Sequence, residues 1–294
     1  MENFKGSRNC NHLLHVLGIT PWGFISSEMN HNLCLIERGV ELELVFILFG
    51  LFIVAILYSS VGHGGASGYL AILSFTTYGV MSSAWLKQHA WCLNLVVSGI
   101  AFYHYHKANH HIPKLTWPFV VGSVPFAILG GYLIVDGVIY DTLLSIVLVW
   151  AAYRLLRIND DVNDNFLNIP PKKVAYPIGG GIGFVSGIIG VGGGIFLSPI
   201  MLLNRWATPK NIAATSALFI WINSAAGIFG AIISNQLSMD FQVLIPFVIV
   251  VIVGGYIGSK YGAVFAPQNS VRKLLVIVLL IAATKRVIEL IELN

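Results

Sequence analysis

Two glycine clusters, each set inside a long apolar stretch, constrain the fold of this chain more than any other feature. The first cluster covers residues 60–68 and the second covers residues 187–195. Consecutive glycines break a helix because a residue without a Cβ atom leaves the backbone poorly fixed. In a bilayer, a broken backbone is tolerated only where protein buries it or a water-filled cavity solvates it. Two such breaks, at corresponding places in two halves of a chain, are typical of a midplane binding site in a transporter.

The composition is that of a helical membrane protein. Hydrophobic residues make up 56% of the chain and charged residues 10%, against roughly 25% charged residues in soluble domains. Apolar runs long enough to cross about 30 Å of hydrocarbon recur along the chain, without the alternation of a β-barrel strand. The net charge of +4 is explained by basic cytoplasmic loops, and no basic stripe with interleaved aromatic residues predicts a nucleic-acid partner. We therefore predict an all-α, polytopic integral membrane protein that works in the lipid bilayer without a cofactor.

The chain divides into a polar N-terminal tail and two similar halves. Residues 1–41 form the tail, for which an interfacial helix, a disordered segment and an upstream start codon all remain open. Residues 42–157 form a first transmembrane repeat, residues 158–173 a cytoplasmic linker and residues 174–294 a second repeat. The glycine clusters lie 128 positions apart, and two further pairs of matching segments lie 124 and 131 positions apart. Such constant offsets indicate an internal duplication.

Each half contains five apolar elements, and the second element is too short to cross the bilayer. The segment Ile195–Leu203 reaches only about 14 Å at 1.5 Å per residue. The first two elements of each half therefore form either a re-entrant hairpin that meets at the glycines or a full helix followed by a half helix. The expected elements are 42–59, 67–80, 86–105, 117–135 and 142–156 in the first half, and 174–189, 195–203, 211–234, 241–264 and 271–290 in the second.

The positive charges favour inverted repeats. If the first two elements of each half end on the side where they began, while the other three cross, one face collects most of the Lys and Arg residues. That face is the cytosolic one, because cytoplasmic loops carry an excess of Lys and Arg. A single crossing by the paired elements would leave the two faces nearly equal. We therefore predict two inverted repeats in the inner membrane, with both termini outside (periplasmic) and the basic loops cytoplasmic.

The residues around the breaks suit a small anion. The N-terminus of a half helix has unpaired backbone N–H groups and a partial positive charge, and one such terminus follows each cluster. No Asp or Glu lies near the centre of a span, which argues against a cation site built from carboxylates. His63 is the one ionisable side chain within the breaks, and it is a candidate proton carrier or anion donor unless a backbone carbonyl satisfies its ring. The predicted substrate-binding residues are Gly62, His63, Gly64, Gly65, Ser67, Asn94, Gly190, Gly192, Gly193, Gly194, Thr215, Ser216 and Asn223.

Purely structural explanations and two alternative functions compete with this prediction. Hydroxyl groups in membrane helices often bond to their own backbone, and this could be the fate of the Ser and Thr residues. Close helix packing explains the glycines at 130–131, 179–181 and 254–255. The cluster from His104 to His111 resembles one histidine box of a membrane di-iron enzyme, but such a site needs ligands from several segments, and all nine histidines lie at or before His111. A passive anion channel would use the same donors as a carrier.

The glycine motifs resemble those of a known transporter family. Residues 62–70 (GHGGASGYL) and 190–200 (GVGGGIFLSPI) are similar to the TauE/SafE sulfite exporter family, also called the 4-toluene sulfonate uptake permease family. The segment 214–218 (ATSAL) is similar to another stretch of that family, and the resemblance covers residues 44–288. The family pattern has a proline after the glycines, which Pro199 matches and Ala71 does not. The resemblance implies a secondary transporter of sulfite, thiosulfate or organosulfonate. Proton coupling through His63 is a further hypothesis, and the sequence does not indicate the oligomeric state.

Overall fold

The computed structural model describes residues 27–133, 135, 168–267, 270 and 273, and gives the backbone alone for residues 27–41 and 74. The expected elements 142–156 and 271–290 lie outside the described residues, apart from the helical residue 273, as do the tail up to residue 26 and most of the linker. The chain separates into two units, Met1–Ile47 and Leu48–Asn294. In the first unit, the described residues form the beginning of the helix α2 (Ser27–Ser59). Part of the predicted polar tail is therefore helical.

The described part of the chain is built from helices, and no strand occurs in it. Among the described residues, four helices are long and apolar enough to cross a membrane, and they include residues 42–59, 113–132, 209–233 and 241–265. These findings confirm the prediction of an all-α, multi-pass membrane protein. The helices after α2 are α3 (Ala66–Ser74), α4 (Ser83–Lys107), α5 (Pro113–Tyr132), α7 (Lys172–Ile189), α8 (Gly194–Leu203), α9 (Pro209–Ile233) and α10 (Phe241–Lys260), with a 3-10 turn at Thr77–Val80 and a π turn at Tyr261–Phe265.

The short second element of the first half folds back along the helix before it. A methyl group placed on Gly50 of α2 would lie 2.9 Å from the Ile72 side chain of α3, and one on Gly68 of α3 would lie 2.6 Å from Val54 of α2. The two helices therefore run side by side in opposite directions, and residues 42–59 of α2 are themselves long enough to span a membrane. The element also ends earlier than predicted, because α3 stops at Ser74 and the Thr76 hydroxyl accepts the N–H of Tyr78 to begin a 3-10 turn.

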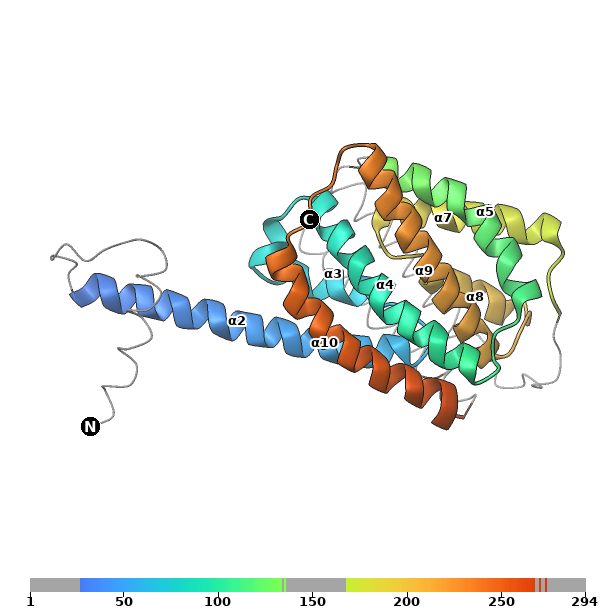
Figure 1. Cartoon of the computed structure of the whole chain (residues 1–294), viewed down its shortest axis with the longest axis horizontal. Helices are drawn as coiled ribbons and strands as arrows, with labels where there is room; N and C mark the ends of the chain where they lie inside the picture. The colour runs from blue at the N-terminus through green and yellow to red at the C-terminus, as the bar shows by residue number, and fades with distance from the viewer. Residues whose placement is uncertain (1–26, 134, 136–167, 268–269, 271–272, 274–294) are drawn as a thin grey trace. The chain divides into compact units, whose positions relative to one another are not determined.

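Two corresponding helices, α4 and α9, pack against each other in opposite directions at the centre of the bundle (Figure 1). Near the start of α4, the Gln88 amide donates to the carbonyl of Gln236, just beyond the end of α9. Beyond the end of α4, the carbonyl of His110 accepts from the Asn211 amide near the start of α9. The next helix of each half then packs on the central helix of the other half: α5 lies against α9, and α10 lies against α4.

Glycines allow the outer helices to pack closely, as expected for small residues in a membrane. Methyl groups on Gly130 of α5 and Gly179 of α7 would lie 2.4 Å and 2.3 Å from backbone oxygens of the facing helix, and one on Gly254 of α10 would lie 2.7 Å from the carbonyl of Phe52. The packing explanation is therefore confirmed for these positions. It is wrong for Gly181, which has no atom of another segment within 4 Å of an added methyl group.

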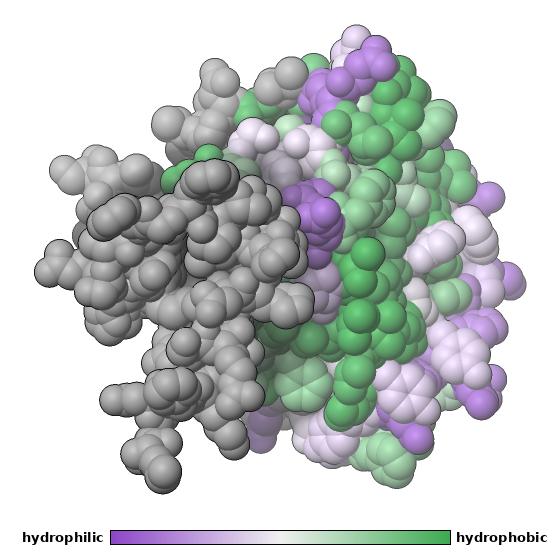
Figure 2. Space-filling view, turned by 60° about the vertical axis from the view of Figure 1, so that its left-hand side comes forward, coloured by the Kyte–Doolittle hydropathy of each residue, from purple (hydrophilic) through white to green (hydrophobic). Residues whose placement is uncertain are grey.

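The outer faces of the spanning helices are apolar. Trp117 and Val121 of α5, and Ile245 and Ile249 of α10, are each at least half exposed. Figure 2 shows broad hydrophobic areas of this kind, with hydrophilic side chains gathered toward the upper and right-hand edges of the coloured part. A soluble protein rarely exposes so much contiguous apolar surface, whereas lipid covers it at no cost.

Candidate functional site: two glycine breaks that meet across α4 and α9

Both glycine clusters adopt a backbone conformation that favours glycine. Gly62 and Gly65 have φ angles of 75° and 97°, and Gly65 is the residue before the first turn of α3. In the second cluster, Gly190 ends α7 with φ 89°, and Gly193 precedes α8 with φ 81°. A residue with a Cβ atom is strained at such angles. The chain therefore reverses direction at each cluster and starts a short helix with its N-terminus buried inside the protein.

The two breaks contact the opposite halves of the protein at matching positions. A methyl group on Gly62 would meet the backbone of Ala213 in α9, and one on Gly190 would meet Lys87 in α4. Methyl groups on Gly64 and on Gly192 would both meet Asn94 of α4 and Ile220 of α9. The glycines of each pair are 128 positions apart, and the helical residues that they contact are 126 positions apart. The contacts are therefore reciprocal: the break of the first half meets α9 of the second half, and the break of the second half meets α4 of the first.

Asn94 joins the two breaks. Its Oδ1 atom accepts the N–H of Ala66 at 3.0 Å, so α4 supplies an N-terminal cap for α3. Its Nδ2 atom donates to the Ser224 hydroxyl of α9 at 3.4 Å. The side chain is fully buried, and it lies within 3 Å of methyl positions on both Gly64 and Gly192. The structure therefore brings together the predicted residues Gly64, Asn94 and Gly192.

His63 lies in a chain of hydrogen bonds that crosses between the halves. Its Nδ1 atom is 3.0 Å from the carbonyl of Val61, which can only accept, so Nδ1 carries the hydrogen and Nε2 of the neutral ring accepts. The Ser198 hydroxyl of α8 is 3.3 Å from Nε2 and 2.7 Å from the Ser216 hydroxyl of α9. Ser198 then donates to His63, and Ser216 donates to Ser198. Sequence reasoning named His63 and Ser216 but missed Ser198, which connects them.

The other predicted polar residues differ in where their side chains point. Ser67 shares a hydrogen bond of 2.9 Å with the Tyr58 hydroxyl of α2. Thr215 faces α5, where its hydroxyl lies 2.9 Å from that of Thr116. Asn223 of α9 is 1% exposed, and neither atom of its amide has a hydrogen-bond partner among the described residues. Their roles in binding stay predictions.

The burial of Lys87 could not be predicted from the sequence. Lys87 is 3% exposed, its Cβ atom lies beside Gly190, and its Nζ atom donates to the carbonyl of Leu133 at 3.1 Å. The same Nζ atom is 5.6 Å from the centre of the Trp91 ring. A lysine near a helix end is normally solvated. Hydropathy alone therefore predicts a side chain at the membrane interface here and does not indicate burial. The base of the Lys87 side chain thus lies next to the second break, while its Nζ atom lies at the end of α5.

Two residues of the histidine cluster, His104 and His110, have ordinary structural partners. The Nδ1 atom of His104 lies 2.7 Å from the Ser259 hydroxyl, and the Nε2 atom of His110 lies 3.1 Å from the carbonyl of Ala263. Within the described ranges, no group of three or more His, Cys, Asp and Glu side chains is placed to hold a metal ion. A di-iron site has no support in this geometry.

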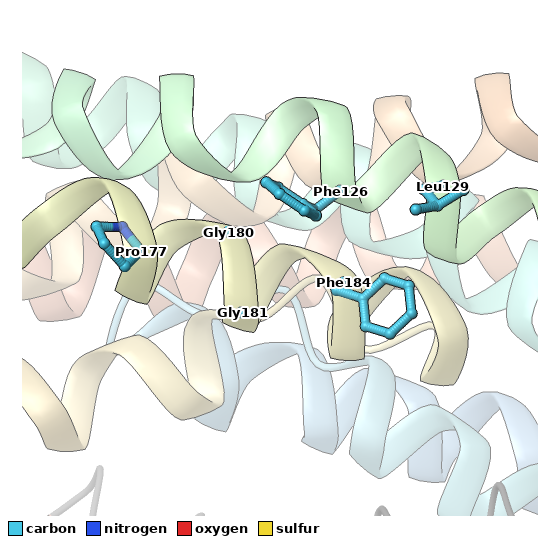
Figure 3. Close-up of a pocket in the computed structure, with 6 residues that line it drawn as sticks. All are labelled: Phe126, Leu129, Pro177, Gly180, Gly181 and Phe184. Atoms are coloured by element: carbon cyan, nitrogen blue, oxygen red, sulfur yellow. The ribbon is translucent and has the colours of Figure 1, made fainter.

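A pocket of about 360 Å³ lies between α5 and α7, away from the breaks (Figure 3). Phe126 and Leu129 line it from α5, and Pro177 and Phe184 from α7, with Gly180 and Gly181 at its floor. None of these side chains offers a hydrogen bond or a charge, so the pocket cannot hold an anion. It is an apolar hollow in the surface that faces lipid.

Comparison with known proteins decides the family. The family model described as Sulfite exporter TauE/SafE matches residues 46–286, which is most of the chain. The chain belongs to the TauE/SafE family. This match confirms the resemblance drawn from the glycine motifs and makes the chain a member of a membrane transporter family.

Two relatives of this TauE/SafE protein are named as transporters. The probable membrane transporter protein y4hK of Sinorhizobium fredii (strain NBRC 101917 / NGR234) is 31% identical over 249 residues, which cover 84% of this chain and 99% of the relative. The probable membrane transporter protein YunE of Bacillus subtilis (strain 168) is 27% identical over 119 residues, or 40% of this chain and 41% of that protein. No solved structure matches the chain significantly.

Proposed function

We propose that this TauE/SafE protein is a secondary transporter that carries a small sulfur-containing anion, such as sulfite, thiosulfate or an organosulfonate, by alternating access. The reciprocal contacts of the two glycine breaks with α4 and α9 carry this proposal. They bring two buried helix N-termini to one pair of residues, Asn94 and Ile220. Helix N-termini attract anions, and broken helices at the contact between two repeats are typical of alternating-access carriers.

The antiparallel course of α4 and α9 supports the inverted arrangement of the repeats. The two helices occupy equivalent places in the two halves, so opposite directions across the membrane imply opposite orientations of the halves. We propose both termini outside the inner membrane and the linker, residues 158–173, in the cytosol. Single cysteines at positions 158–168, in a protein whose Cys10, Cys34 and Cys92 are replaced by serine, should react with an impermeant maleimide only after the cells are opened. Labelling in intact cells would overturn this orientation.

The transport activity is tested with purified protein in liposomes. We expect sulfite or thiosulfate loaded on one side to drive saturable uptake of the labelled anion from the other side. This exchange distinguishes a carrier from the second candidate, a passive channel, which conducts without counterflow. Liposomes that show no flux of any sulfur anion above protein-free vesicles would refute the proposed function.

Proton coupling through His63 is a second hypothesis for the same site. A proton on Nε2 would turn the imidazole from acceptor to donor, so the Ser198 and Ser216 hydroxyls would have to reverse their hydrogen bonds. A conformational change tied to this reversal would couple protonation to transport. Flux into pH-clamped liposomes should therefore lose its pH dependence in His63→Gln. An unchanged pH profile in that variant removes His63 from the coupling mechanism while leaving anion transport in place.

A further inference from the structure

Most polar side chains at the two breaks already have partners within the protein. The hydroxyls of Ser67, Ser198, Thr215 and Ser216, the ring of His63 and the amide of Asn94 all take part in hydrogen bonds. Asn223 differs, because its Nδ2 and Oδ1 atoms are both buried and both lack a partner among the described residues. A buried amide without partners costs free energy, so a native protein that keeps one usually has a ligand or water for it.

Two further buried donors, in helices of the same bundle, lack a described partner. They are the Nε1 atom of Trp91 in α4 and the hydroxyl of Ser186 in α7, in residues 0% and 1% exposed. Phe219, Asn223 and Gly227 follow one another at four-residue spacing on one face of α9. A methyl group on Gly227 would lie 2.7 Å from Trp91 Cε2, the ring atom bonded to Nε1.

The other end of this face of α9 reaches the second break. A methyl group on Gly193 would lie 2.8 Å from the Phe219 ring and 3.3 Å from Ser186 Cβ. Asn223 therefore lies on α9 between the residue that contacts the second break and the residue that contacts Trp91. The N–H groups of Gly192 and Gly193 also lack a hydrogen-bond partner among the described residues, which adds the N-terminus of α8 to the same set of donors.

The first break does not repeat this arrangement. The residue 128 positions before Ser186 is Tyr58, whose hydroxyl is bonded to Ser67. The N–H groups of Gly64 and Gly65 lack a partner among the described residues, as those of Gly192 and Gly193 do. The difference lies in the side chains: the Tyr69 ring lies against Gly65, within 2.7 Å of a methyl position there, and its hydroxyl is buried without a described partner. Large phenol rings thus occupy the first break where a small serine stands in the second.

We propose that Trp91 Nε1, the Ser186 hydroxyl and the Asn223 amide bind the transported oxyanion beside the second glycine break, with the ammonium of Lys87 supplying positive charge. This inference rests on the proposed function, because it assumes that the chain carries an anion. The two breaks have the same backbone conformation, but the anion binds at the second one. Donors from three helices and from the α8 N-terminus can each meet a separate oxygen, so an oxyanion binds and a single halide ion does not.

The test is equilibrium binding to the purified full chain in detergent. Sodium sulfite and sodium thiosulfate are titrated against sodium chloride at constant ionic strength, by calorimetry and by tryptophan fluorescence. We expect Trp91→Phe, Ser186→Ala and Asn223→Leu each to weaken oxyanion binding by about tenfold or more, the usual effect of losing a hydrogen bond to a charged group. Trp91→Phe should also abolish the fluorescence change, and chloride should not compete.

Variants of the first break are the matched controls. Tyr69→Phe and Tyr58→Phe should change the affinity less than twofold. Asn223→Leu should melt at or above the wild-type temperature without ligand, because it removes a buried amide that has no partner, and this shows that its loss of binding is not misfolding. If the first-break variants weaken binding as much as Ser186→Ala does, or more, the proposed asymmetry is wrong and the anion site of the proposed function remains. If the wild-type protein binds none of these oxyanions, the proposed function fails as well.

Discussion

Replacing Gly62 by alanine tests directly whether close approach and a positive φ angle are what the first break requires. The new Cβ would lie 2.1 Å from the carbonyl oxygen of Ala213, where an ordinary contact is 3.4 Å or more, so the break and α9 must separate by about 1 Å. Strain at φ 75° adds about 1–2 kcal/mol, and overpacking of this kind costs typically 1–3 kcal/mol. We expect a total loss of about 2–5 kcal/mol.

The assay is thermal unfolding of the purified variants in one detergent, followed by anion flux in liposomes. Gly62→Ala should melt several degrees below the wild type, with reduced flux, because separation from α9 breaks the contact between the halves. Gly181→Ala is the matched control, since an added methyl group there meets no atom within 4 Å. A helical Gly→Ala change without a clash gains about 0.5–1 kcal/mol. If Gly62→Ala is as stable and as active as Gly181→Ala, the described approach of the first break to α9 is wrong.

Three further predictions concern hydrogen bonds on the same framework. Asn94→Leu leaves the N–H of Ala66 without its acceptor and should cost about 1–3 kcal/mol in denaturation experiments. Ser198→Ala removes the donor to His63 and should lower the melting temperature, while Ser198→Thr restores it. Burial lowers the pKa of His110 below its usual value of about 6.5. As the pH drops, the unfolded state therefore binds a proton before the folded state does, and the free energy of unfolding falls below about pH 6.5. His110→Gln should flatten this decline between about pH 7 and pH 5.

The broken helices could be predicted from the sequence because glycine acts locally. The glycines at 62–65 and 190–194 end a helix through positive φ angles that residues with a Cβ atom rarely adopt, whereas the run at 179–181 stays within α7. The bilayer then limits where an ended helix can lie. The predicted start of α8 differs from the observed Gly194 by one residue. The end of α3 was harder to predict, because the turn at Thr76 depends on one side-chain hydrogen bond. Hydropathy does not distinguish this position from the rest of the expected element, residues 67–80.

The partners of the polar side chains could not be predicted in the same way. Thr215 and Ser216 are adjacent on α9, yet one hydroxyl faces α5 and the other faces α8. Adjacent helical residues point about 100° apart, so the sequence shows that they differ in direction but not which neighbour each one meets. Lys87 is buried only because α4 lies beside the second break, a contact between residues more than one hundred positions apart. Long-range packing of this kind leaves no local signal.

The two breaks can keep the same backbone conformation while their side chains differ, because the interactions that fix the backbone do not depend on those side chains. The positive φ angles and the contacts with Asn94 and Ile220 require glycine in both copies, so substitution there is costly on either side. Positions such as 58 and 186, or 63 and 191, carry no such requirement and differ in size and polarity. A carrier with two identical half-sites would hold its anion equally from both halves. With His63 and Tyr58 at the first break, and Val191 and Ser186 at the second, the two halves would present different side chains to an anion between them, and their relative motion would change which of these side chains the anion meets.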